Sequence, residues 1–127
     1  MATPTFDDRE WPLVRIRQSH ALSDHDFGAL LDYIDALFLR GQRFAVLLDV
    51  REAPPLTAPQ RKAVAERANK SCASYPTRLT GMALVMSSAL QRGVFTAIQW
   101  LCKDSHPTRA FGDITSAEAW LRACLDA

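Results

Sequence analysis

The sequence is poor in cysteine and has no long apolar run. Its three cysteines among 127 residues show no CxxC spacing and give no disulfide framework, so we expect reduced, buried thiols at Cys72, Cys102 and Cys124. The longest apolar runs, 44–48 and 82–86, are far shorter than the roughly 20 residues that a membrane-spanning helix needs. No membrane span is therefore predicted.

Several enzyme motifs are also missing. The sequence has no P-loop, no GxGxxG, no HExxH and no GxSxG. Cys102 and His106 are four residues apart, but Pro107 follows where the predicted helix ends, so a shared rigid face is not indicated. His20 and His25 flank a turn with acidic residues, which is a weak metal signature. We predict no catalytic residue, no metal site and no cofactor.

Length and composition fit one globular domain, which we place at 1–127. Hydrophobic residues make up 48% and charged residues 23%, which are ordinary values for a folded protein and exclude disorder. The first ten residues carry acids and lack the basic and then apolar order of a signal peptide. A cytoplasmic location is therefore expected.

Charge is unevenly distributed, although the net charge is only +1. Residues 1–57 hold six basic and nine acidic side chains (−3), residues 58–109 eight and two (+6), and residues 110–127 one and three (−2). Four bases of the middle segment fall in one predicted helix: Arg61, Lys62, Arg67 and Lys70. They suit an acidic partner surface, although a solvated helix face is the commoner use. Nucleic acid is not predicted, because no aromatic residue interleaves with these bases.

Four capping-box spacings alternate with apolar runs. A hydroxyl residue precedes an acid or amide by three positions at Ser23–Asp26, Thr57–Gln60, Ser88–Gln91 and Thr115–Glu118. They predict helices over about 23–40, 57–75, 88–106 and 116–125. The apolar runs predict strands at 3–6, 13–17, 44–50, 79–86 and 109–111.

The strand–helix order favours parallel neighbours, with an antiparallel hairpin at the N-terminus. The run 44–50 is apolar on both faces, so we expect it at the centre of the sheet, with Leu48 buried. Helix 57–75 has a thin apolar face and should be the most exposed.

This pattern resembles the STAS-like superfamily, small α/β domains that include the anti-sigma-factor antagonists. The similar segments are the buried strand ending LLDV, the capped helix after it, the junction MALVMSS and the terminal FGDITSAEAWL. The resemblance implies a STAS-like α/β domain with four to five mostly parallel or mixed strands and four helices. It also implies that the domain binds protein partners; some relatives bind nucleotides or lipids.

In the antagonists, an Asp-Ser pair at the start of the helix after the central strand carries a regulatory phosphate. The corresponding region here reads DVREAPPLTAPQ. Thr57 occupies the nearest comparable place but lacks the Asp-Ser-Ser-Gly context, so the resemblance alone does not extend this regulation to the chain.

Polar residues are expected at the carboxyl ends of the central strands, where open α/β sheets bind ligands. They are Asp49, Arg51, Thr57, Ser87, Ser88 and Arg92. Helix-start amides with a hydroxyl and a guanidinium suit an anion or phosphate. The simpler interpretation is that Thr57 and Ser88 only cap helices, and that Asp49 pairs with Arg51 or a backbone amide.

We therefore predict a non-enzymatic regulatory or scaffolding module that acts through protein–protein interaction. A homodimer is expected, because an open edge strand invites a symmetric partner. The alternative is a binding domain for an anionic small molecule, a nucleotide or a lipid.

Overall fold

The computed structural model describes residues 4–54, 56–87 and 107–127. The helix predicted over 88–106 lies outside these residues, together with the predicted site residues Ser88 and Arg92. Cys102 and His106 lie outside them as well.

Five strands form one sheet, and their order in the sheet follows their order in the sequence. They are β1 (Thr5–Asp7), β2 (Leu13–Arg17), β3 (Phe44–Asp49), β4 (Leu79–Val85) and β5 (Thr108–Phe111). β1 is antiparallel to β2, and the other neighbouring pairs are parallel. The N-terminal hairpin and the central position of β3 are thus confirmed.

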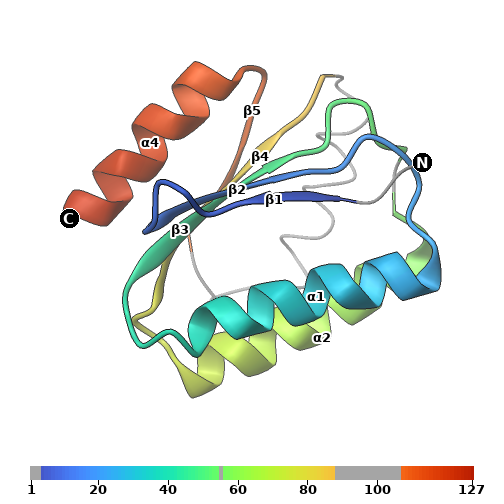
Figure 1. The fold of residues 1–127 in the computed structure, drawn as a ribbon, viewed down its shortest axis with the longest axis horizontal. Coiled ribbons are helices and arrows are strands. Elements are labelled where there is room, and N and C mark those ends of the chain that lie inside the picture. Colours follow the sequence, from blue (N-terminus) through green and yellow to red (C-terminus); the bar gives the residue numbers. More distant parts are fainter. Residues whose placement is uncertain (1–3, 55, 88–106) are drawn as a thin grey trace.

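Three helices are described: α1 (Asp24–Phe38), α2 (Ala58–Ser74) and α4 (Ile114–Asp126). Figure 1 shows α1 and α2 on one face of the sheet and α4 on the other. Successive right-handed crossovers that advance in one direction along a sheet place their helices on the same face, which explains the position of α1 and α2. The α/β class is confirmed.

Side chains alternate along β3, so its two faces belong to two cores. Phe44 and Val46 face α1 and α2, while Ala45 and Leu47 face α4. The first core also holds Val14, Ile16, Leu30, Leu37, Phe38, Cys72 and Leu79, and the second holds Leu13, Ala83, Val85, Ala117 and Leu121. Leu48, expected to be buried, is only half-buried at the carboxyl end of the strand.

Two predicted helix starts are confirmed. The Ser23 hydroxyl accepts the Asp26 amide at 3.1 Å. At α2 the capping box is complete: Thr57 Oγ1 accepts the Gln60 amide at 3.3 Å, and Gln60 Oε1 accepts the Thr57 amide at 3.1 Å. As expected from its thin apolar face, α2 buries only Ala65 and Cys72.

The start expected at Thr115 is wrong. The N-cap of α4 is Asp113, whose carboxylate accepts the Ser116 amide at 2.8 Å. That hydrogen bond holds the pKa of Asp113 below its ordinary value. A carboxylate is the stronger cap here because it adds a negative charge at the positive end of the helix dipole. Thr115 is therefore inside the helix.

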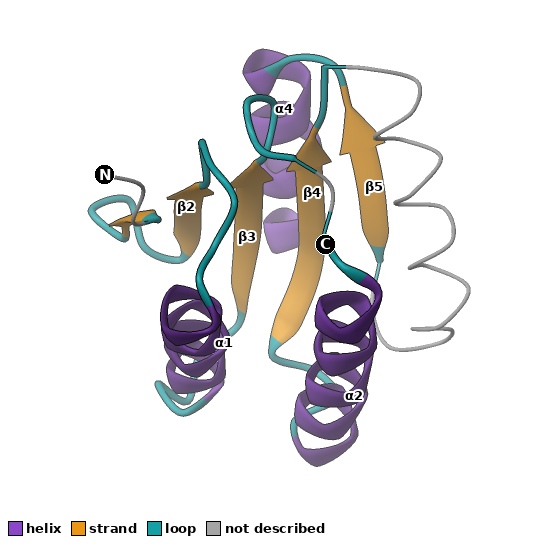
Figure 2. Cartoon of the chain, turned by 90° about the vertical axis from the view of Figure 1, so that its right-hand side faces the viewer, coloured by secondary structure: helices purple, strands orange, loops and turns teal. Residues whose placement is uncertain are grey.

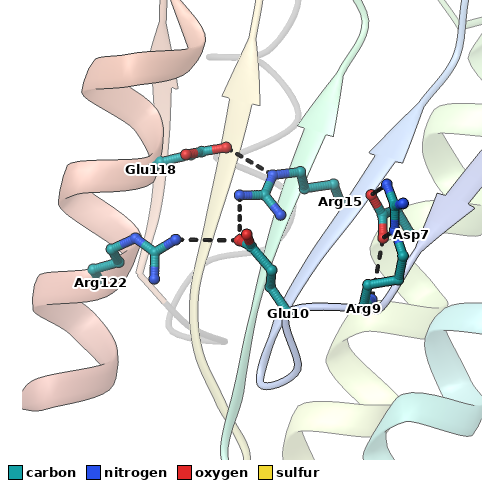
Figure 3. A network of polar contacts seen from close by, with 6 residues as sticks. All are labelled: Asp7, Arg9, Glu10, Arg15, Glu118 and Arg122. Carbon is teal, nitrogen blue, oxygen red and sulfur yellow. Dashed lines mark hydrogen bonds and ion pairs between the residues drawn. The ribbon is translucent and has the colours of Figure 1, made fainter.

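A charged network joins the turn after β1 to both β2 and α4 (Figure 3). The Arg15 guanidinium on β2 donates to Glu118 on α4 and to Glu10 in the turn, each at 2.7 Å. Arg122 on α4 also donates to Glu10, at 3.2 Å. The hydrogen bond from Arg15 lowers the pKa of Glu10, so this carboxylate stays ionised near neutral pH. The network positions α4 relative to the N-terminal hairpin.

Two neighbouring leucines of β3 face different cores and differ in how deeply they are buried. Leu47→Ala removes a side chain that is 2% exposed, so we expect it to lower the free energy of unfolding by about 2–5 kcal/mol. Leu48→Ala, on the opposite face and half-buried, is the matched control and should cost clearly less. Urea denaturation measures both losses; equal losses would contradict this assignment of the two faces.

Candidate functional site

A buried carboxylate lies at the end of β3. Asp49 is only 6% exposed, and its two oxygens accept Arg51 Nε at 3.0 Å and Arg51 Nη2 at 2.9 Å. Asp49 Oδ1 also accepts the amide of Arg51 at 3.2 Å. The arginine therefore closes the chain back onto the strand end through its guanidinium and its backbone. This is the simpler of the two sequence interpretations of the Asp49–Arg51 pair.

Electrostatics at Asp49 favour the ionised form. Burial raises the pKa of its carboxyl, but the hydrogen bonds and charge of Arg51 outweigh that effect, and Arg17 adds a smaller attraction. The pKa of Asp49 therefore lies below its ordinary value, and the same contact raises the pKa of Arg51. A carboxylate held in this state is a poor proton donor near neutral pH.

The end of β4 is joined to the same loop. The Ser87 hydroxyl donates to the carbonyl oxygen of Arg51 at 3.0 Å, and the Val50 amide donates to the carbonyl oxygen of Val85 at 3.1 Å. The structure thus brings together Asp49, Arg51 and Ser87, three of the six residues singled out in the sequence. Their mutual bonds hold the loop in place.

Sequence reasoning missed Arg17, Gln18 and Glu52, which surround this cluster. The Gln18 amide donates to the carbonyl oxygen of Asp49 at 2.9 Å, and its side chain, 5% exposed overall, donates to the carbonyl oxygen of His20 at 3.1 Å. Arg17 forms an exposed ion pair with Glu52 at 3.3 Å. The signal that could have found Arg17 and Gln18 is their place at the carboxyl end of β2, which neighbours β3, and Glu52 directly follows Arg51 in the loop after β3.

The basic residues of α2 have different surroundings. Arg67 faces α1, where its guanidinium contacts Asp32 at 2.8 Å and Asp35 at 2.5 Å. The hydrogen bonds that Arg67 donates, first to Asp32 and then to Asp35, raise the pKa of Arg67. Ser71 also donates to Asp35, at 3.0 Å. Arg67 is therefore a link between the two helices and not an outward-facing cation.

The other three bases are more open to a partner. Arg61 Nη1 donates to the carbonyl oxygen of Leu56 at 2.7 Å and is partly exposed. Lys62 is exposed and lies 4.0 Å from Glu66, one helical turn further on, and Lys70 is exposed. The outward basic surface is thus centred on Lys62 and Lys70.

The described residues offer neither a metal-binding cluster nor a membrane-spanning helix. Within residues 4–54, 56–87 and 107–127, no group of three His, Cys, Asp or Glu side chains could hold a metal ion. The same residues contain no helix that is both long enough and apolar enough to span a bilayer.

Comparisons with known proteins agree with this fold. A family model described as SpoIIAA-like matches residues 13–122. The structure is similar to the crystal structure of an uncharacterized DUF3478-family protein with a SpoIIAA-like fold from Shewanella loihica PV-4, with a TM-score of 0.67 and 16% identity over 95% of each chain. At that identity the similarity shows the fold. No curated protein matches the chain.

Asp49→Asn tests the clamp, by which we mean the three hydrogen bonds from Arg51 to the Asp49 carboxylate. The amide keeps the shape of the carboxylate but loses its charge, so we expect a loss of about 1–3 kcal/mol in the free energy of unfolding at pH 7. Glu52→Gln, which alters an exposed ion pair, is the control and should cost about 0–1 kcal/mol. Chemical denaturation measures both values.

The pH dependence gives an independent check. Because folding lowers the pKa of Asp49 below 3.8, its contribution is present above that pH and is lost as the pH falls through the folded-state pKa. The gap in stability between the parent protein and Asp49→Asn should therefore narrow below pH 3.8. A gap that widens on acidification would contradict the clamp.

Proposed function

The chain belongs to the SpoIIAA-like family, and from this premise we propose that it is a non-enzymatic regulatory or scaffolding module that acts by binding another protein. The family suggests a regulatory protein-interaction domain. The cytoplasmic location expected from the sequence stays a prediction.

The observation that carries this proposal is the use of polar groups at the carboxyl edge of the sheet. Asp49 and Arg51 bind each other, Ser87 binds the Arg51 carbonyl, and Thr57 is bonded within the α2 cap. Small-molecule sites offer convergent polar groups to a ligand. Here the hydrogen bonds of these four side chains stabilise the loop and the helix cap. This favours a docking surface elsewhere on the domain.

The outward side of α2 is the docking surface that we propose. The helix buries only two of its residues, and its exposed side carries Lys62 and Lys70 with Arg61 nearby. A cationic surface of this kind is complementary to an acidic partner, and such complementarity mainly speeds encounter and selects the partner. Self-association is a further part of the proposal, because β1 is the end strand of the sheet in the part of the chain that the structure describes.

The double variant Lys62→Ala/Lys70→Ala tests the α2 surface. We expect it to weaken capture of the partner about three- to tenfold, since each exposed ion pair contributes roughly 0.2–1 kcal/mol. The matched control, Arg43→Ala/Arg109→Ala, also removes two exposed cations but away from α2, and should leave capture unchanged. The immobilised domain is incubated with an extract of the source cells, and the captured proteins are measured by quantitative mass spectrometry.

Two outcomes would contradict the proposal. Equal capture by both double variants would place the docking surface away from α2. A rise in the melting temperature with inorganic phosphate or ATP that Arg92→Ala abolishes would instead support the alternative function, binding of an anionic small molecule.

A further inference from the structure

β1 is the end strand of the sheet among the described residues. It pairs with β2 on one side, and no described strand lies on its other side. Figure 2 shows this short strand beside β2 at one end of the sheet. Because an edge strand presents backbone amides and carbonyls, it is a ready template for pairing with another strand.

The two faces of β1 differ in character. Phe6 is opposite Ile16 and therefore lies on the α1 side, where its ring stacks on Tyr33 with centroids 4.1 Å apart. Even so, Phe6 is 36% exposed. It is one of two large apolar side chains exposed in the part of the chain that the structure describes, the other being Leu39.

Thr5 and Asp7 occupy the opposite face of the strand, the side of α4. They pair in register with Arg17 and Arg15 of β2. Asp7 accepts two hydrogen bonds from the Arg9 guanidinium, each at 3.0 Å (Figure 3), and these lower its pKa to about 2. Asp7 therefore stays ionised at the sheet edge throughout the ordinary pH range, as the acidic half of an ion pair with Arg9.

We propose that two copies of this chain pair their β1 strands antiparallel, centred on Phe6, about a two-fold axis perpendicular to the sheet. This inference rests on the self-association proposed above and specifies the strand and the register through which two copies pair. The pairing joins two five-stranded sheets into one. On the helix side, each Phe6 meets the partner's Phe6, with a Tyr33 ring outside each of them.

Charge complementarity on the other face supports the same register. Centring on Phe6 puts Thr5 opposite the partner's Asp7. Arg17 lies next to Thr5 on that face, about 10 Å from the partner's Asp7 by strand spacing, and its side chain is 59% exposed. Long arginine side chains span such a gap, and the symmetry makes the contact twice. Within one chain Arg17 already pairs with Glu52 and Asp7 with Arg9, so the contact across the edge adds to these ion pairs.

The neighbouring registers of the β1–β1 pair are less favourable. A shift of one residue in each copy that keeps the two-fold would set Asp7 against the partner's Asp7, and like charges directly opposite destabilise strand pairs. The opposite shift centres the pair on Thr5 and separates the two Phe6 rings. The centred register alone combines aromatic contact on one face with opposite charges on the other.

Sedimentation equilibrium between about 10 and 200 µM tests the dimer. The parent protein should show a dimer that Phe6→Lys converts to monomer, because the new charges would face each other at the two-fold axis. Leu39→Lys is the matched control: it alters the other exposed apolar side chain, away from β1, and should leave the dimer intact. Circular dichroism confirms that both variants are folded.

A cross-linking pair tests the register itself. Directly opposite residues have Cβ atoms about 5 Å apart, so Phe6→Cys should give a covalent dimer on mild oxidation. Thr5→Cys is the control, because its two copies would lie about 8 Å apart on the diagonal, too far for a disulfide. Both variants keep the three native cysteines, so any background linkage appears equally in both.

A monomer throughout this concentration range would overturn the inference. A dimer lost with Leu39→Lys but kept with Phe6→Lys, or equal cross-linking at positions 5 and 6, would also overturn it. A monomer would remove the self-association proposed above, but all these failures are separate from failure of the docking surface proposed on α2. Capture of an acidic partner that depends on Lys62 and Lys70 can persist in a monomeric protein, and a β1 dimer can form without such a partner.

Discussion

Burial of β3 on both faces is the constraint on which the other elements depend. Phe44 and Val46 need cover from α1 and α2, and Ala45 and Leu47 need cover from α4, so neither layer is optional. A strand enclosed in this way must also satisfy its backbone and polar groups at its ends, where water is scarce. The chain meets that requirement at the carboxyl end with Asp49, which receives three hydrogen bonds from a residue two positions later.

The clamp changes the expected role of the carboxyl edge. In open α/β sheets this edge collects strand ends and helix starts, and their orphan polar groups commonly meet a ligand. Here Arg51 supplies the cation, Ser87 ties in the next strand, and the cap of α2 is closed by Gln60. Asp49, Arg51 and Ser87 therefore stabilise a loop that contains Pro54, and the docking surface that we propose lies on α2.

Sequence patterns predicted what is decided locally. β2, α1 and α2 follow from alternation, helical spacing and caps, and the Asp49–Arg51 contact spans only two residues. Contacts between distant segments were not predictable: Arg15 meets Glu118 across 103 positions, and Arg67 meets Asp35 across 32. Glu118 illustrates the difference, because its spacing from Thr115 suggested a cap while the fold uses it to bind β2.

Long-range contacts of this kind also explain how a strand of only three residues keeps a defined position at the edge of the sheet. The turn after β1 is anchored on both layers: Asp8 pairs with Arg40 at 2.7 Å on the α1 side, and Glu10 pairs with Arg15 and Arg122 on the α4 side. An isolated short hairpin has little stability of its own. Anchoring by side chains from both layers fixes its position before any partner arrives, and a preorganised edge loses less conformational entropy when it binds.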